Sequence, residues 1–464
     1  MDGMQQKIQL ELAFPAESTG EAPKTAGEAP KTAGEGTEPF TAKSETERPA
    51  TERLMEEVCE RENANKALRR VRSNQGSPGI DGKTVDKLRV HLIEHWPAIR
   101  EQLLAGTYKP RAVKRVTIQK PDGGERKLGI PTALDRFIQQ AILQVLQPIW
   151  DSTFSDQSYG FRPGRSAHQA VAKAQEYIGQ GKTIVVDMDL EKFFDRVNHD
   201  ILMSRVARKV ADKRLLKLTR AYLTAGVMEN GLVSPTDEGT PQGGPLSPFL
   251  SNIMLDELDK ELERRGHSFV RYADDCNIYV KTERAGQRVM ESVKHFLTRK
   301  LKLKVNEKKS AVGKPQERKF LGFSFTWGKE LKRRIAPVAL KRFKTKVREL
   351  TGTGRSINQT VRNLAKYLIG WRGYFSFCQT PTVLQDLESW IRRRLRSIVW
   401  RQWKRGTNRY AELRRRGIPH FPAAVAAGAP KGPWRMARHA TLQRAFPNVY
   451  FDSLGLPRLV VRNA

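Results

Sequence analysis

Two adjacent aspartates, Asp274 and Asp275, stand between two short apolar runs in the stretch FVRYADDCNIYVKT, residues 269–282. The pattern predicts a strand, a tight bend and a second strand, with both carboxylates at the tip of the hairpin. Another apolar strand is predicted at 183–189, and it ends at Asp187 and Asp189, which lie on one strand face because they are two residues apart. If these strands are neighbours in one sheet, carboxylates far apart in sequence meet at one point.

Converging carboxylates are typical of two-metal phosphoryl transfer, in which two divalent ions sit about 3.5–4 Å apart. Mg²⁺ prefers hard oxygen ligands and takes one or two carboxylates together with substrate phosphates. The alternative is structural, since aspartate favours turns and a pair at a hairpin tip needs no catalytic role. The alternation of Cys276, Ile278 and Val280 after the pair favours a hairpin packed into a sheet.

The charge of the chain indicates a polyanionic partner. There are 83 Lys and Arg against 50 Asp and Glu, a formal net charge of +33. Nucleic acid is the usual partner of such a surplus, because binding releases its counterions. Ribosomal association and an anionic membrane surface are the alternatives, and no apolar run approaches the roughly 18 residues of a membrane span. The three cysteines form no close pair, which is typical of a reduced, cytosolic protein without a zinc module.

Further elements surround the carboxylates. A hairpin is predicted within residues 111–136, and its turn at 121–124 is flanked by Lys120, Arg126 and Lys127. These cations are either solvated surface charges or groups that hold a triphosphate. A Gly/Pro loop at 239–246 leads into an amphipathic helix that Ser247 caps and Gly266 ends.

The C-terminal third is basic and aromatic. Residues 335–403 have a helical pattern in which Arg and Lys alternate with aromatic residues. Those aromatics either pack in a helix-bundle core or stack on RNA bases. For Trp371, Tyr374 and Phe375, whose spacing is helical, we predict core positions. After Trp403 the chain is basic and Pro-rich, and we expect irregular structure there.

In combination, these segments resemble the reverse transcriptases encoded by bacterial group II introns. YADD at 272–275 resembles the catalytic motif of that family, and DLEKFF resembles the segment with the first catalytic aspartate and its aromatic gate. The resemblance runs from about residue 54 to the C-terminus. Five further segments match family blocks in order: the hairpin at 116–130, YGFRPGRSAHQA, TPQGGPLSPFLSN, KVNEKKS and KFLGF.

The resemblance implies an α+β fold of the right-hand polymerase type, with an antiparallel palm sheet and an α-helical thumb or maturase domain. The implied domains are a disordered tail with an EAPKTAG repeat at 1–50, an N-terminal extension at 51–110, fingers and palm at 111–330, and the thumb at 331–464. The segments QGSPGIDG and YLIGWRGYFSFC resemble the family's N-terminal extension and thumb.

The resemblance also assigns roles to particular residues. Two Mg²⁺ ions, which Mn²⁺ can replace, are expected to be held by Asp189, Asp274, Asp275 and the Leu190 carbonyl. Contacts to the incoming dNTP are expected from Lys120, Arg126, Gln242 and Phe194. The Phe194 ring is expected to exclude a ribose 2′-hydroxyl, although it could also be an ordinary core residue. Arginines expected to contact RNA are Arg162, Arg165, Arg392, Arg393, Arg394 and Arg396.

The implied function is RNA-directed DNA polymerisation together with binding of a group II intron RNA to promote splicing and retrohoming. The implied partners are that RNA, an RNA template with a DNA or RNA primer, target DNA and dNTPs, in the cytoplasm or nucleoid-associated particles of a bacterium, with no membrane. Residues 431–459 resemble the tail of the compact class C type, so we expect no HNH nuclease domain. The alternatives are a maturase without polymerase activity and a retron, diversity-generating or CRISPR-associated reverse transcriptase.

Overall fold

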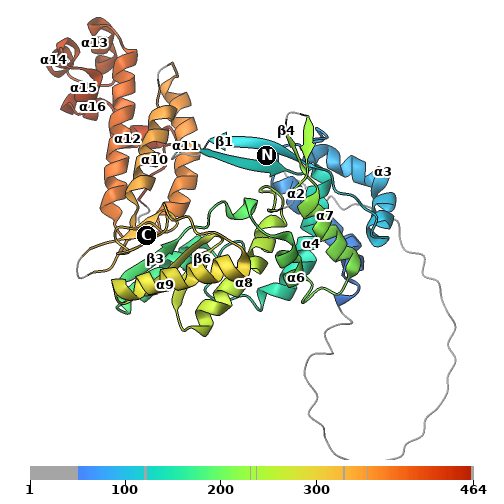
Figure 1. The fold of residues 1–464 in the computed structure, drawn as a ribbon. Coiled ribbons are helices and arrows are strands. Elements are labelled where there is room, and N and C mark those ends of the chain that lie inside the picture. Colours follow the sequence, from blue (N-terminus) through green and yellow to red (C-terminus); the bar gives the residue numbers. More distant parts are fainter. Residues whose placement is uncertain are drawn as a thin grey trace, which may run out of the picture. The chain divides into compact units, whose positions relative to one another are not determined.

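The computed structural model describes residues 51–119, 123–229, 231–236, 238–327, 330–352 and 354–460. Helices and short strands occupy the described residues as far as Ile335, and helices follow from there, which confirms the predicted α+β class (Figure 1). The described residues form two compact units. The first contains residues 51–166, 188–278 and 287–311, and the second contains 167–187, 279–286 and 312–460. This division does not follow the predicted domain boundaries at 110 and 330, which stay a prediction. The predicted tail lies outside the described residues.

The first unit begins with helices that cover one another through apolar faces. The Thr132 side chain caps α4 by accepting a hydrogen bond from the Asp135 backbone N–H at 3.0 Å, as expected of a helix start. Buried residues of these helices include Leu92, Trp96 and Phe137, and the last two rings meet edge to face. The helices are α1 (Leu54–Cys59), α2 (Arg61–Ser73), α3 (Val85–Leu104), α4 (Ala133–Asp151), α6 (His199–Val206) and α7 (Lys213–Thr224).

The predicted hairpin at 111–136 is confirmed within the first unit. Strands β1 (Val113–Gln119) and β2 (Glu125–Ile130) pair antiparallel, with Gln119 opposite Glu125. β4 (Val227–Glu229) adds to β1 in parallel, and β5 (Leu232–Ser234) completes a sheet of order β2-β1-β4-β5. The sheet brings residues from the hairpin close to the loop after β5.

The YADD hairpin is also confirmed. Strands β6 (Ser268–Tyr272) and β7 (Asp275–Val280) belong to a sheet of order β6-β7-β3-β8, with β3 at Ile184–Met188 and β8 at Ala311–Gly313. Two residues connect β6 to β7, as in a tight antiparallel hairpin.

Helix α8 (Ser247–Arg264) follows the Gly/Pro loop as predicted, and Gly266 (φ +69°) lies just beyond its end. The predicted cap at Ser247 is wrong. Leu246 is the N-cap, because the Ser247 hydroxyl instead donates to the Pro241 carbonyl at 2.7 Å. Helix α9 (Glu283–Phe296) comes after the YADD hairpin and ends in a π-helical turn at Leu297–Leu301.

The second unit is mainly helical, as predicted for the thumb, and α10, α11 and α12 are its long helices (Figure 1). Trp371 is buried and stacks on Phe375 with ring centroids 4.7 Å apart, so the core prediction is confirmed for these two rings. The Tyr374 hydroxyl donates to the Leu321 carbonyl. The elements are α5 (Ala167–Gly179), β9 (Phe323–Phe325), β10 (Arg333–Ile335), α10 (Pro337–Leu350), α11 (Ile357–Phe375) and α12 (Pro381–Gln402).

The prediction of irregular structure after Trp403 is wrong. Five short helices follow within residues 404–460, and apolar residues such as Leu413, Met436 and Phe446 join the core of the second unit. The helices are α13 (Gly406–Arg415), α14 (His420–Gly428), α15 (Pro433–Met436), α16 (Ala440–Ala445) and α17 (Asn448–Ser453). Across the described part of the chain, none of the helices has the length and apolar character needed to cross a membrane.

Candidate active site

The tip of the YADD hairpin separates its two aspartates. Ala273 has a left-handed backbone (φ +57°), and the chain turns so that Asp274 is half-buried while Asp275, the first residue of β7, is exposed. Asp274 borders a cavity of about 790 Å³ in the first unit, and Asp275 is not among its lining residues. The structure therefore brings one of the two hairpin aspartates to the cavity.

Asp189 borders the same cavity, just after β3. The loop KVNEKKS holds its backbone: the Asp189 N–H donates to the Ser310 hydroxyl at 2.9 Å, and the Asp189 carbonyl accepts from the Asn306 N–H at 2.8 Å. Leu190, whose carbonyl was predicted to bind metal, also borders the cavity and forms an antiparallel bridge with Val305.

Asp187, predicted on the same strand face as Asp189, has a structural partner. The Arg318 guanidinium donates to its carboxylate at 2.7 and 3.0 Å, and both residues belong to the second unit. Asp187 is not among the residues that line the cavity. The two-residue spacing in the sequence did not reveal that Asp187 forms a structural ion pair while Asp189 borders the cavity.

The two cavity carboxylates influence each other electrostatically. Burial raises the pKa of Asp274 above its ordinary value, and the negative charge of Asp189 adds to this rise, whereas Arg126 and Arg271 oppose it. A bound cation would relieve the repulsion between the two carboxylates. Their oxygens are the hard donors that Mg²⁺ prefers, so this donor set fits the predicted metal. Among the described residues, no group of three or more His, Cys, Asp or Glu is suited to holding a metal ion.

The predicted dNTP-binding residues lie along the same cavity. Arg126 of β2 donates through Nε to the Gln242 side-chain oxygen at 2.8 Å, and both residues line the cavity. The Gly129 N–H donates to the Gln242 carbonyl at 2.8 Å, which attaches the Gly/Pro loop to β2. Lys120, the other predicted triphosphate contact, lies outside the described residues.

Phe194 lies in a short 3₁₀ turn, Phe193–Asp195, and lines the cavity with 8% of its surface exposed. Its carbonyl accepts a hydrogen bond from the Thr240 N–H at 2.6 Å, and its ring meets the Phe193 ring edge to face at 5.3 Å. The ring is thus held between the core and the cavity, which agrees with either of its two interpretations.

Sequence reasoning missed several cavity residues. Lys309 approaches the Asp189 carboxylate at 3.9 Å, and Arg196 pairs with Glu191 at 3.1 Å. The KVNEKKS segment was identified as a family block, but its residues were given no role. Other lining cations without an assigned role are Arg115 and Lys192, whereas Lys127, predicted beside the hairpin turn, also lines the cavity.

Three of the six arginines predicted to contact RNA are buried, and the structure contradicts the prediction for them. Arg162 is 8% exposed and donates to the Asp151 carboxylate and to the carbonyls of Ser155 and Ser158. A guanidinium enclosed in this way satisfies backbone carbonyls rather than phosphates. The other two are Arg392, 3% exposed, and Arg396, 8% exposed.

Arg392 forms ion pairs with Glu388 at 3.2 Å and Asp452 at 2.9 Å, while Arg396 donates to the Phe446 carbonyl at 2.9 Å. Burial alone would raise the pKa of Asp452, but the hydrogen bonds from Arg458 and Arg392 outweigh it and hold that pKa below its usual range. Arg392 and Arg396 therefore connect α12 to the C-terminal segment.

The remaining three arginines are half-exposed. Arg165 pairs with Asp156, Arg393 lies 3.9 Å from the centre of the Trp434 ring, and Arg394 donates to the Thr351 hydroxyl. Part of each side chain is accessible, so an RNA contact stays a prediction for these residues.

Replacing Arg392 with alanine is expected to lower the free energy of unfolding by about 3 kcal/mol, because its buried ion pairs with the half-buried carboxylates of Glu388 and Asp452 are lost, although Asp452 keeps its pair with Arg458. Arg393→Ala is the matched control, because Arg393 is the next residue in the same helix and its guanidinium is half-exposed. Urea denaturation followed by circular dichroism measures both. Equal, small losses for the two variants would contradict a structural role of the Arg392 ion pairs.

The comparisons with known proteins identify two protein families along the chain. Residues 118–325 match the family model of reverse transcriptases (RNA-dependent DNA polymerases), and residues 340–417 match the model of the group II intron maturase-specific domain. YkfC of Escherichia coli strain K12 is 35% identical over 301 residues, which cover 56% of this chain and 79% of YkfC. LtrA of Lactococcus lactis subsp. cremoris, a group II intron-encoded protein, is 31% identical over 325 residues, 55% of this chain and 54% of LtrA.

Among solved structures, a telomerase from Candida albicans with a fragment of telomeric RNA has a TM-score of 0.39 at 12% identity, covering 65% of this chain and 63% of that one. The matched domains and the carboxylate cavity define an enzyme of the reverse transcriptase class. Within that class, the chain belongs to the group II intron reverse transcriptases, which carry a maturase-specific domain. It spans about half the length of LtrA.

Proposed function

We propose that this protein copies an RNA template into cDNA at the cavity bordered by Asp189 and Asp274, and that it binds a group II intron RNA to promote its splicing and retrohoming. The observation that carries the first part is the meeting of these two carboxylates with Arg126, Gln242 and Phe194 around one cavity. The maturase-specific domain at 340–417 supports the second part.

In the proposed reaction, the primer 3′-oxygen attacks the α-phosphorus of the dNTP, a new P–O bond forms, and pyrophosphate leaves with the electrons of the broken bond. Asp189 and Asp274 would hold Mg²⁺, which lowers the pKa of the attacking hydroxyl and stabilises the in-line transition state. Arg126 offsets the charge of the triphosphate, and its hydrogen bond to Gln242 orients both side chains toward the nucleotide. The Phe194 ring limits the space beside the sugar.

The proposed partners are the intron RNA, a primed RNA template, target DNA and dNTPs, and the proposed setting is a bacterial ribonucleoprotein particle near the nucleoid. The resemblance of residues 431–459 to the class C tail supports membership of that compact type.

Primer extension tests the polymerase proposal. The native chain is incubated with an RNA template, a DNA primer, dNTPs and Mg²⁺, beside Asp274→Ala/Asp275→Ala. Full-length cDNA from the native chain and none from the variant is the expected result. If neither extends the primer while both bind intron RNA tightly, the polymerase proposal is wrong and a maturase without polymerase activity explains the chain. Splicing of the precursor RNA at low Mg²⁺, with and without protein, tests the second part.

Arg126→Ala is expected to raise the KM for dNTP about tenfold with a smaller change in kcat, because a charge-assisted contact is lost in the ground state and the transition state alike. Lys114→Ala is the matched control: it removes a cation from β1 of the same sheet, at an exposed position that is not among the cavity-lining residues. Steady-state primer extension at varied dNTP measures both. An equal KM for the two variants would rule out a dNTP contact by Arg126.

RNA binding is expected to weaken at least about tenfold between 50 and 200 mM salt, because phosphate contacts by a chain of net charge +33 release counterions. Fluorescence anisotropy with labelled intron RNA measures the dissociation constant at each salt concentration. Affinity that is unchanged by salt would contradict binding through phosphates.

A further inference from the structure

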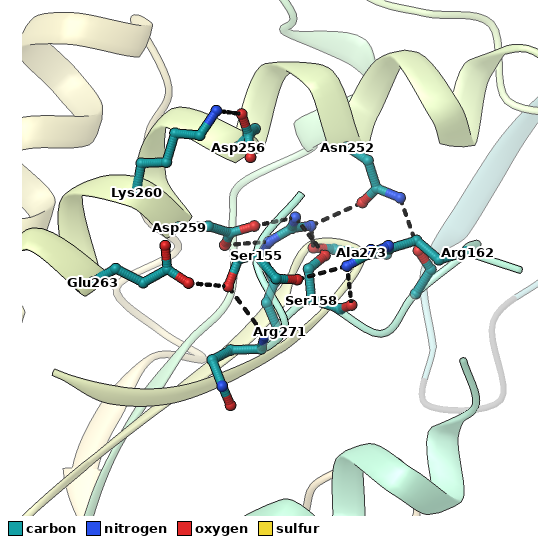
Figure 2. Close-up of polar contacts among 12 residues, drawn as sticks. Ser155, Ser158, Arg162, Asn252, Asp256, Asp259, Lys260, Glu263, Arg271 and Ala273 are labelled. Carbon is teal, nitrogen blue, oxygen red and sulfur yellow. Dashed lines mark hydrogen bonds and ion pairs between the residues drawn. The ribbon is translucent and has the colours of Figure 1, made fainter. Parts of the chain in front are cut away.

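Arg271 is a buried cation three residues before Asp274. It lies in β6 with 0% of its surface exposed, so it cannot touch a substrate. Its guanidinium occupies the centre of a polar cluster beneath the YADD turn, between Asp259, Asn252 and Ser158 (Figure 2). A charge at such depth requires a partner and full hydrogen bonding.

All three guanidinium nitrogens of Arg271 donate hydrogen bonds. Nε and Nη2 reach the two carboxylate oxygens of Asp259 at 2.7 and 2.5 Å, a bidentate pair that fixes the plane of the guanidinium. Nη2 also reaches the Ser158 hydroxyl at 2.7 Å, and Nη1 reaches the Asn252 side-chain oxygen at 3.0 Å. Because these bonds fix the orientation of the guanidinium, they also fix the direction of the second N–H group on Nη1.

This second N–H group of Arg271 donates a hydrogen bond to the backbone at the tip of the YADD hairpin. Nη1 reaches the Ala273 carbonyl at 3.0 Å, and this carbonyl belongs to the peptide bond that leads into Asp274. Ala273 is in the left-handed region (φ +57°), which costs energy for a residue with a Cβ. A Cβ on Gly160 would lie 2.4 Å from the Ala273 amide nitrogen, so the loop before α5 also encloses the turn. The orientation of this peptide plane determines where the Asp274 side chain leaves the backbone.

We propose that Arg271, oriented by Asp259, is a positioning residue that holds the Ala273–Asp274 peptide so that the Asp274 carboxylate faces the cavity. This inference rests on the proposed role of Asp274 as a metal ligand. A lysine cannot replace the arginine, because a single ammonium cannot bind Asp259 in a bidentate fork and reach Asn252 and the Ala273 carbonyl at once.

Arg162 supplies a matched control. It is also a buried arginine of the same polar cluster, near Ser155 and Ser158 (Figure 2). It pairs with Asp151 and donates to the carbonyls of Ser155 and Ser158. Its guanidinium donates to Asp151 and to the loop with these two serines rather than to the hairpin. Arg162→Lys therefore removes a buried guanidinium from the neighbouring loop and leaves the hydrogen bond between Arg271 and the Ala273 carbonyl in place.

The experiment measures Mn²⁺ binding to the full chain from the electron paramagnetic resonance signal of the free ion, with Asp274→Ala defining the contribution of the site. Arg271→Lys is expected to weaken that binding about tenfold and to raise the Mg²⁺ concentration at half-maximal primer extension by a similar factor. Arg162→Lys is expected to lower the melting temperature comparably and to leave both metal measurements near native values. High Mg²⁺ is expected to restore much of the kcat of Arg271→Lys.

Each outcome has one meaning. If Asp274→Ala leaves Mn²⁺ binding unchanged, the proposed metal site is wrong. If Asp274→Ala reduces it but Arg271→Lys and Arg162→Lys behave alike, the metal site stands and the positioning role of Arg271 is wrong. If Arg271→Lys does not fold, Asn252→Ala replaces it in the experiment, because this variant removes one hydrogen-bond acceptor of the Arg271 guanidinium. A native metal affinity in folded Asn252→Ala would then overturn the inference.

Discussion

Asp274→Asn is expected to lose at least about 10³-fold in the rate of cDNA synthesis, whereas Asp275→Asn is expected to lose less than about tenfold. The two residues are adjacent, but Asp274 borders the cavity and Asp275 is exposed outside it. Loss of a metal ligand removes several kcal/mol of transition-state stabilisation. Loss of an exposed carboxylate changes only the electrostatic potential near the site. Single-turnover primer extension on a preformed template–primer complex measures both rates.

Asparagine is the informative replacement at Asp274 because it keeps the size of the side chain and removes its charge. Burial and the charge of Asp189 raise the pKa of Asp274, so the folded state disfavours its charged form. A neutral side chain there is expected to leave the melting temperature equal to or above that of the native chain. An inactive variant that is also less stable would indicate a folding defect. Equal losses in both variants would make Asp275 a third metal ligand, as the sequence predicts.

The same pair of variants separates polymerisation from RNA binding. RNA binding rests on cations, and Asp274 contributes none, so the affinity of Asp274→Asn for intron RNA is expected to equal that of the native chain. Fluorescence anisotropy gives this affinity under the conditions of the extension assay. A parallel loss of RNA binding in a folded variant would contradict the separation of the two functions.

The strands and the bend that carry Asp189 and Asp274 were predictable because their motifs are local. Asp274 and Asp189 each follow an apolar strand, and a tight bend or strand end exposes the next polar side chain. Asp274 and Asp275 differ in the direction of their carboxylates because the residue before them, Ala273, has a left-handed backbone. An alanine in the sequence gives no indication of a positive φ. The hairpin was therefore predictable, but the direction of each carboxylate was not.

Burial of arginine was the main failure of prediction. The run at 392–396 is typical of a basic surface. Arg392 and Arg396 nevertheless lie inward, because Asp452 and the Phe446 carbonyl, 60 and 50 residues later in the chain, accept their hydrogen bonds. Arg162 lies inward for the same kind of reason, with the Ser155 and Ser158 carbonyls beside it. These partners come from tertiary structure, and no periodicity along the chain reveals them.

The fold shows the same contrast. Long periodic segments such as α8, α11 and α12 were predicted because a helical stripe of apolar residues repeats several times. The short helices after Trp403 were missed because each contributes few buried residues, among them Leu413, Met436 and Leu442. Each becomes stable through packing on the core of the second unit.

Phe194→Val is expected to raise the incorporation of ribonucleotides relative to deoxyribonucleotides about 100-fold. The ring borders the cavity, and the hydrogen bond from the Thr240 N–H fixes the backbone that carries it. A smaller side chain opens space for a 2′-hydroxyl, so the kcat/KM for rNTP rises while that for dNTP changes little. Primer extension with one rNTP or one dNTP at a time measures the ratio.

Phe193→Val distinguishes a gate from an ordinary core residue. Phe193 is 2% exposed and packs against Phe194, so its truncation creates a cavity in the core and is expected to cost at least as much stability as truncation of Phe194. If Phe194 acts through its position beside the sugar, Phe193→Val keeps the native preference for dNTP despite its lower melting temperature. If both variants shift the preference equally, the effect comes from general loosening of the cavity wall. If neither shifts it, Phe194 is a core residue and sugar selection depends on other groups around Thr240 and Gln242.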